Sequence, residues 1–134
     1  MGVLFDYFSA PSDEAAATAI NRIGGPGVSS KDTPPPPAFD TFSTKVIDPF
    51  VKLGNVEARL TGRDDTEIGR GPRAGKILAE EDDGALLVVT LTDELQTALA
   101  DADPEGLGPW LGGLAELARR ACIRGERLYC RICV

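Results

Sequence analysis

Short apolar segments at the two ends of the chain, and others inside it, predict the strands of a sheet. Residues 3–8 are apolar on both faces apart from one aspartate, which is typical of an interior strand. Residues 85–91 form the most hydrophobic stretch and predict a central strand, joined as a hairpin to residues 77–78. Residues 128–134 alternate between two faces, so we expect the last strand to be tucked into the sheet. A short strand over residues 41–47 completes the set.

Apolar residues three or four positions apart predict the helices. The clearest stripe runs over residues 109–124, where apolar positions repeat every 3.6 residues and Gly125 marks the end. Shorter helices are expected over residues 13–23, 49–61 and 93–102. Each of them begins after a Ser, Asp or Thr, whose side-chain oxygen can accept hydrogen bonds from the free amides of the first turn.

The order of these elements predicts an α+β fold with a single mixed β-sheet of about five strands and three to four packed helices. The length of 134 residues allows one domain, spanning residues 1–134. Residues 24–38 are rich in proline and glycine and predict a connector within that domain. Its run from Pro34 to Pro37 suits either a surface connector or a ligand for a proline-binding groove, and its role stays open.

Composition excludes several classes of function. The chain has no histidine, which removes Ser-His and Cys-His catalytic pairs and imidazole metal ligands. It has 14 Lys and Arg against 21 Asp and Glu, a net charge of −7, so we expect no nucleic-acid partner. No apolar run approaches the roughly 20 residues of a membrane span, so we expect no membrane partner. An odd number of cysteines and no sign of a secretory signal predict a cytoplasmic protein.

Cys130 and Cys133 have the CxxC spacing of zinc and redox sites. On an extended strand, residues three apart point to opposite faces, and neither a second pair nor a histidine is present to complete a zinc site. We therefore expect structural thiols, no metal site and no cofactor. Asp6 stands within an apolar strand, and we expect it to pair with Arg131 on a neighbouring strand, because an unpaired buried carboxylate is costly.

Acidic residues are concentrated in one part of the chain. Between Lys76 and Arg119 there is no Lys or Arg, and the predicted hairpin turn in this span contains Glu80, Glu81, Asp82 and Asp83. A solvated face is one interpretation of these four residues. The other is a contact surface for another protein, and a basic partner would match the charge. Since no catalytic constellation is found, we expect a non-catalytic protein-binding domain, one form of which is an acidic neutraliser or immunity-type protein.

The glycine-rich loop over residues 69–76 carries the alternative function. It has the glycine content of a phosphate-binding loop, but no strand precedes it and no helix follows it. Its candidate anion ligands are Arg70, Arg73 and Lys76. The alternative is therefore a small enzyme or ligand-binding protein with a pocket near Tyr7, Trp110 and this loop. The sequence does not decide whether the protein has any catalytic activity.

Three short motifs resemble a known family. Met1-Gly2 leads directly into a strand with Tyr7-Phe8, a middle helix closes on Leu60-Thr61-Gly62, and an arginine-bearing helix ends at Gly125 before the last strand. In these features the chain resembles the YfbM-like family of bacterial proteins of unknown function, and small actinobacterial proteins in general. The resemblance implies an α+β fold and no known activity, so it assigns no catalytic residue.

Overall fold

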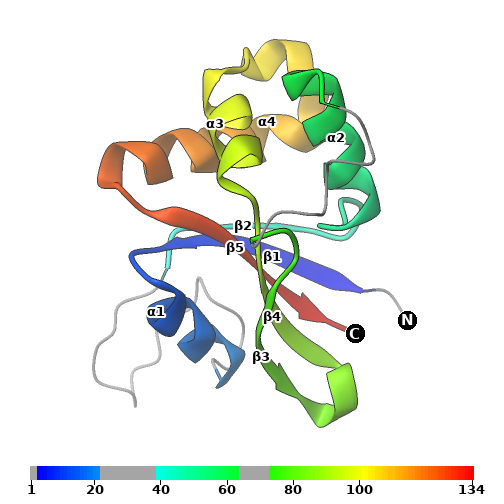
Figure 1. Cartoon of the computed structure of the whole chain (residues 1–134). Helices are drawn as coiled ribbons and strands as arrows, with labels where there is room; N and C mark the ends of the chain where they lie inside the picture. The colour runs from blue at the N-terminus through cyan, green and yellow to red at the C-terminus, as the bar shows by residue number, and fades with distance from the viewer. Residues whose placement is uncertain (1–2, 22–38, 64–72) are drawn as a thin grey trace.

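The computed structural model has the α+β fold that the sequence predicts (Figure 1). It describes residues 3–21, 39–63 and 73–134. The predicted connector over residues 24–38 and the predicted anion ligand Arg70 lie outside these ranges. No helix among the described residues is long and apolar enough to cross a membrane.

Five strands form one sheet in the order β2-β1-β5-β4-β3. In chain order they are β1 (Leu4–Ala10), β2 (Thr41–Thr44), β3 (Ile77–Glu81), β4 (Leu86–Thr90) and β5 (Arg127–Cys133). The strands that the sequence predicts as interior, β1, β4 and β5, each have a neighbour on both sides. The prediction for the last strand is confirmed as well, because β5 lies at the centre of the sheet.

All four pairs of neighbouring strands are antiparallel, which corrects the prediction of a mixed sheet. The two helices between β4 and β5 pack against each other and return the chain to the end of the sheet at which β4 stops, so that Thr90 lies opposite Tyr129. A strand that enters there runs antiparallel to β4. The apolar pattern of a strand does not depend on the direction of its neighbour, so the sequence pattern does not predict whether the pairs are parallel or antiparallel.

Helices cover both faces of the sheet (Figure 1). They are α1 (Asp13–Ala17), α2 (Val51–Thr61), α3 (Asp93–Asp101) and α4 (Pro104–Arg124). Tyr7 and Cys130 belong to the core on the side of α2, α3 and α4, while Phe8 and Tyr129 pack with residues of α1 on the other side. Successive residues of β1 and β5 thus serve opposite cores, which confirms the alternation predicted for the last strand.

Most elements differ from their predicted bounds at one end or both, and three of these differences have a local cause. After α1 the chain continues as a 3-10 turn (Thr18–Asn21). α4 begins at Pro104, because Asp103 accepts a hydrogen bond from the amide of Glu105 and starts a first turn that stops at Gly108, whose φ is 81°. The acidic turn is shorter than predicted: Glu80 and Glu81 belong to β3, and only Asp82–Gly84 form the turn.

Candidate functional site

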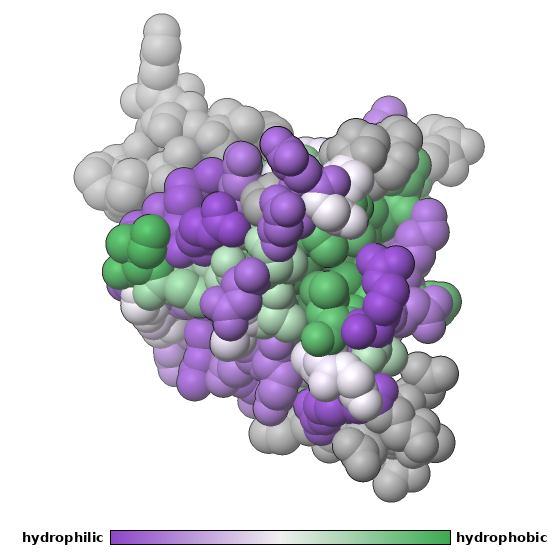
Figure 2. All heavy atoms as spheres, turned by 90° about the horizontal axis from the view of Figure 1, so that it is seen from above, coloured by the Kyte–Doolittle hydropathy of each residue, from purple (hydrophilic) through white to green (hydrophobic). Residues whose placement is uncertain are grey.

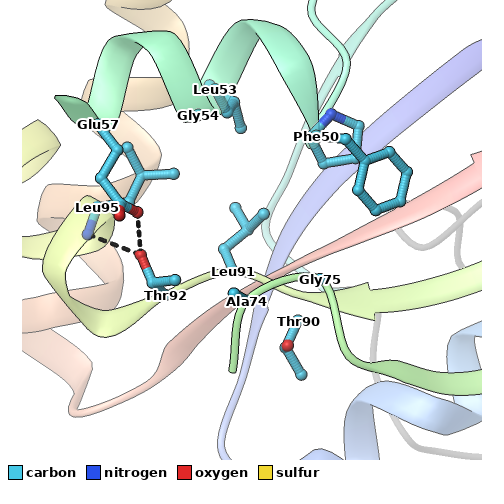
Figure 3. Close-up of a pocket in the computed structure, with 11 residues that line it drawn as sticks. Phe50, Leu53, Gly54, Glu57, Ala74, Gly75, Thr90, Leu91, Thr92 and Leu95 are labelled. Carbon is cyan, nitrogen blue, oxygen red and sulfur yellow. Dashed lines mark hydrogen bonds between the residues drawn. The ribbon is translucent and has the colours of Figure 1, made fainter. Parts of the chain in front are cut away.

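A pocket of about 290 Å³ lies between α2 and the connection from β4 to α3 (Figure 3). Four segments that are far apart in the sequence form its walls: the start and middle of α2, the short stretch before β3, the end of β4, and the start of α3. The lining residues are Pro49, Phe50, Leu53, Gly54, Glu57, Ala74, Gly75, Thr90, Leu91, Thr92 and Leu95.

Two side-chain caps hold the helices that form this pocket. The Asp48 carboxylate accepts hydrogen bonds from the amides of Phe50 (3.0 Å) and Val51 (2.6 Å), which fixes the start of α2. The Thr92 hydroxyl accepts from the amide of Leu95 at 3.1 Å, which fixes the start of α3. Both caps satisfy amides that have no partner within the helix. The pocket is therefore placed by the caps that the sequence predicts at these two positions.

Glu57 is the charged residue of the lining, and it is only 3% exposed. It follows Leu53 by one helical turn, so its side chain lies on the buried face of α2. The Thr92 hydroxyl donates a hydrogen bond to Glu57 Oε1. Glu57 Oε2 is buried and has no hydrogen-bond partner among the described residues. Figure 3 shows the carboxylate directed from α2 toward Thr92, at the α3 end of the pocket.

The other polar side chains of the lining are engaged in holding the fold. The Thr90 hydroxyl donates to the carbonyl of Arg73 at 2.6 Å and accepts from the amide of Lys76 at 3.1 Å. The Thr92 hydroxyl donates a hydrogen bond to Glu57 and accepts one from the amide of Leu95. Neither threonine is therefore set up as a nucleophile, because each hydroxyl proton is already committed.

Aromatic and leucine side chains make the rest of the pocket apolar. Phe50 is 53% exposed and lies against Gly75, where an added Cβ would be 3.1 Å from Phe50 Cε1. Leu53, Leu91 and Leu95 are buried in the core beneath it. An apolar cavity with one buried, incompletely bonded carboxylate can bind a small molecule without reacting with it.

The predicted partner-binding residues lie away from this pocket. Glu80, Glu81, Asp82 and Asp83 are all exposed, at the end of the β3–β4 hairpin that is opposite to Thr90. These four acidic residues are consecutive in the sequence, and the structure places all of their side chains on the surface. It leaves their role as a partner surface a prediction.

Of the three predicted anion ligands, the structure describes Arg73 and Lys76, and their surroundings differ. Arg73 Nη1 donates to both carboxylate oxygens of Asp13, at 3.0 and 3.1 Å, and its guanidinium carbon lies 5.6 Å from the centre of the Tyr129 ring. Arg73 thus ties the stretch before β3 to α1 and β5. Lys76 is exposed, and Arg70 is outside the described residues. Ala74 and Gly75 of the same loop, however, do line the pocket.

Tyr7 does not line this pocket, although the sequence analysis places a pocket near it. Its side chain is fully buried, and its hydroxyl donates to the carbonyl of Ile47 at 2.6 Å. Burial raises the pKa of this hydroxyl well above its usual value of 10.0. An aromatic residue within an apolar strand packs into the core in preference to a surface cavity. The side chain of Trp110 lies outside the described residues.

The thiols are spread over three environments. Cys130 is buried, Cys133 is half-buried and Cys122 is exposed. Burial raises the pKa of the Cys130 thiol well above its usual value, which disfavours the reactive thiolate. No group of three or more Cys, Asp or Glu that could hold a metal ion is found among the described residues.

A second, more open hollow of about 520 Å³ is lined by residues of α2, of α4 and of the stretch between β2 and α2. Its lining residues are Val46, Ile47, Lys52, Asn55, Val56, Arg59 and Leu111. Figure 2, which looks down on the molecule from above, shows hydrophobic surface lying between hydrophilic side chains on this face. None of the residues given for this hollow is among the described residues with a buried, unpartnered polar atom, in contrast to Glu57 in the first pocket.

Sequence reasoning missed Glu57, although a signal was present. The apolar positions used to predict α2 include Leu53 and Leu60, and Glu57 lies four residues after the first and three before the second. A carboxylate at that spacing shares the apolar face of the helix.

Comparison of the chain with protein-family models, with curated proteins and with solved structures finds no match. The resemblance to the YfbM-like family therefore stays a prediction.

Proposed function

We infer that the protein is a non-catalytic binding protein, whose ligand is a small and largely apolar molecule held in the pocket beside α2. The observation that carries this proposal is the pocket itself. Its walls come from four separate segments, its lining is mainly apolar, and one oxygen of the Glu57 carboxylate has no hydrogen-bond partner among the described residues. Apolar cavities with a few placed polar groups are the usual form of small-molecule sites.

Binding is favoured over catalysis by the chemistry of the lining. The chain has no histidine, and both threonine hydroxyls in the pocket donate to fixed acceptors. A single carboxylate with no activated nucleophile beside it lacks the second group that most acid–base mechanisms need. The site of action that we propose is the cytoplasm, where three unpaired thiols would stay reduced.

The test is a titration followed by amide chemical shifts in nuclear magnetic resonance, with indole and 2-phenylethanol as probes. Saturable shifts should appear at the pocket segments of α2 and at the start of α3. Ala74→Phe places a ring at the pocket wall and should abolish them, whereas Lys76→Phe adds the same ring two residues further on, outside the lining. Equal binding to both variants, or no saturable shift with either probe, would contradict the proposal.

A second candidate is the binding of a basic protein through the acidic end of the β3–β4 hairpin. The observation that favours it is the exposure of all four acidic side chains in a span without Lys or Arg. Charge of one sign accelerates encounter with an oppositely charged partner, and salt screens it over about 8 Å at physiological strength.

This candidate is tested by neutralising the hairpin, with Glu80 and Glu81 changed to Gln and Asp82 and Asp83 changed to Asn. Asn suits the positive φ angles of 54° and 55° at the last two positions. Association with a basic probe protein, cytochrome c, should slow several-fold at low salt. The control neutralises four exposed acids elsewhere: Glu94, Asp101, Glu105 and Glu116. An equal effect of both variants would show that net charge alone is responsible.

A further inference from the structure

Among the residues that the structure describes, no cation pairs with the buried carboxylate of Glu57. Among the described residues, the ion pairs involve other acids, and no Lys or Arg pairs with Glu57. Asp6 differs in this respect: it is equally buried, but Arg131 Nη1 lies 3.6 Å from its Oδ2. An ionised carboxylate is strongly disfavoured when it is taken out of water without a cation. A ligand with a positive charge would compensate the Glu57 carboxylate.

The hydrogen bonds around Glu57 determine which of its oxygens is left over. The amide of Leu95 donates to Thr92 Oγ1, so that the hydroxyl proton of Thr92 is directed to Glu57 Oε1. The chain of donors ends there, and Oε2 has no partner among the described residues. An ionised carboxylate accepts hydrogen bonds and donates none. The complementary group on a ligand is therefore a donor, and a charged donor bonds more strongly than a neutral one.

The rest of the pocket limits what can carry that donor. The volume of about 290 Å³ is at the lower end of the range for small-molecule sites, roughly 300–1,000 Å³. Phe50, Leu53 and Leu91 offer apolar contacts, and the side chain of Phe50 is also partly exposed to solvent. A compact apolar body with one charged nitrogen fits both the walls and the carboxylate.

The geometry points to a small primary amine with an aromatic or aliphatic body as the ligand, with its ammonium group bound to Glu57. This inference rests on the proposed function, because it names the class of ligand for the same pocket. Glu57 is the anchor that selects for charge, and Thr92 is the positioning residue that holds its carboxylate.

The test compares two probes that differ in one group, 2-phenylethylamine and the neutral 2-phenylethanol, by the same amide titration at pH 7. The amine should bind about tenfold more tightly or better, as expected for a hydrogen bond between charged groups. Glu57→Gln keeps an oxygen acceptor for Thr92 and removes the charge, so the ratio of the two affinities should fall to near one. Glu94→Gln, an exposed acid outside the lining, should leave the ratio unchanged.

The outcomes separate this inference from the proposed function. If the alcohol binds in the pocket and the amine binds no better, the small-molecule site stands and the choice of an amine is wrong. If the ratio survives in Glu57→Gln, the charge of Glu57 is not the source of selectivity, and the inference is wrong. If neither probe binds, the proposed function fails with it. The comparison of probes on the unaltered protein decides the matter even if Glu57→Gln does not fold.

Discussion

The buried carboxylates of Asp6 and Glu57 have different surroundings in this protein. Asp6 on β1 lies directly opposite Arg131 on β5, and its other oxygen accepts a hydrogen bond from the Ser43 hydroxyl. Both partners are less than 10% exposed. The pairing predicted from the sequence is therefore confirmed, and it compensates two charges in the middle of the sheet. Glu57 on α2 has no such cation among the described residues, which is what makes it a candidate for ligand binding.

At this scale we predict a strong coupling between Asp6 and Arg131. Either single change, Asp6→Val or Arg131→Met, leaves one uncompensated buried charge and should lower the free energy of unfolding by about 3–5 kcal/mol. The double variant should lose much less than the sum of the two, because neither charge remains. Urea denaturation of the four proteins measures the coupling.

The exposed ion pair between Arg127 and Asp93, at 3.3 Å, provides the control for this cycle. Both side chains are more than half exposed, so Arg127→Met should change the free energy of unfolding by less than about 1 kcal/mol. Additive effects of the Asp6 and Arg131 changes would contradict the prediction, since independent residues do not couple.

At the scale of elements, the sequence predicts the strands well because their patterns are local. The alternation in residues 128–134 is sufficient to predict a buried strand, and β5 has the expected faces. The antiparallel pairing of β4 and β5 depends on the path of α3 and α4, which bring the chain back to the end of β4. The apolar pattern of a strand carries no information about that path. The early start of α4 was missed because Gly108, which resembles the end of a turn, interrupts the helix instead.

A glycine at the contact between α4 and β2 leads to the next prediction. A Cβ at Gly113 would lie 2.7 Å from Cδ2 of Phe42, so α4 can approach the edge strand this closely only because Gly113 has no side chain. Gly113→Ala should lower the free energy of unfolding by about 1–3 kcal/mol, the usual cost of overpacking, although alanine favours the helix.

The matched control is Gly106→Ala in the same helix. There the nearest atom to an added Cβ is 3.9 Å away, an ordinary contact. This change should raise the free energy of unfolding by up to about 1 kcal/mol, the difference in helix propensity. Urea denaturation compares the two variants, and stabilisation by both would show that Phe42 moves aside without cost.

At the scale of the whole molecule, two clusters of charged residues join parts of the chain that are distant in sequence. Asp13 on α1 binds Arg73 and accepts a hydrogen bond from the Tyr129 hydroxyl at 2.7 Å. Asp40, just before β2, binds Arg120 at 2.7 Å and Arg124 at 2.9 Å at the end of α4. These partners are 60 to 116 residues apart, so single-sequence patterns do not reveal them.

The same limit applies to the candidate site. Glu57 was visible in the sequence only as an acid on an apolar helix face, and that pattern often marks nothing more than a structural pair. Its meaning depends on Thr92, which lies 35 residues away, and on the absence of a cation around it among the described residues. Ala74 and Gly75 fall within the loop that the sequence analysis singled out, but the pocket wall opposite them comes from α2.

The last prediction concerns acid stability. The hydrogen bond from Tyr129, followed by the contact with Arg73, lowers the pKa of Asp13 below its usual 3.8, against the opposing effect of burial. Hydrogen bonds from Arg120 and Arg124 lower the pKa of Asp40 in the same way. A carboxyl whose pKa is lower in the folded state stabilises the fold above pH 3.8, and this contribution is lost as the pH falls through the folded-state pKa.

We therefore expect the free energy of unfolding to fall steeply below about pH 4, where the unfolded chain takes up protons that folded Asp13 and Asp40 resist. Changing both residues to Asn should lower stability at pH 7 and reduce the further loss between pH 5 and 2, because two titrating groups are gone. Urea denaturation across this pH range measures both effects. The control, Asp82→Asn with Asp83→Asn, removes the same charge from the exposed hairpin turn and should leave the pH dependence nearly unchanged. A parallel pH dependence of the Asp13 and Asp40 variant and the unaltered protein would show that these two clusters do not hold the molecule together in acid.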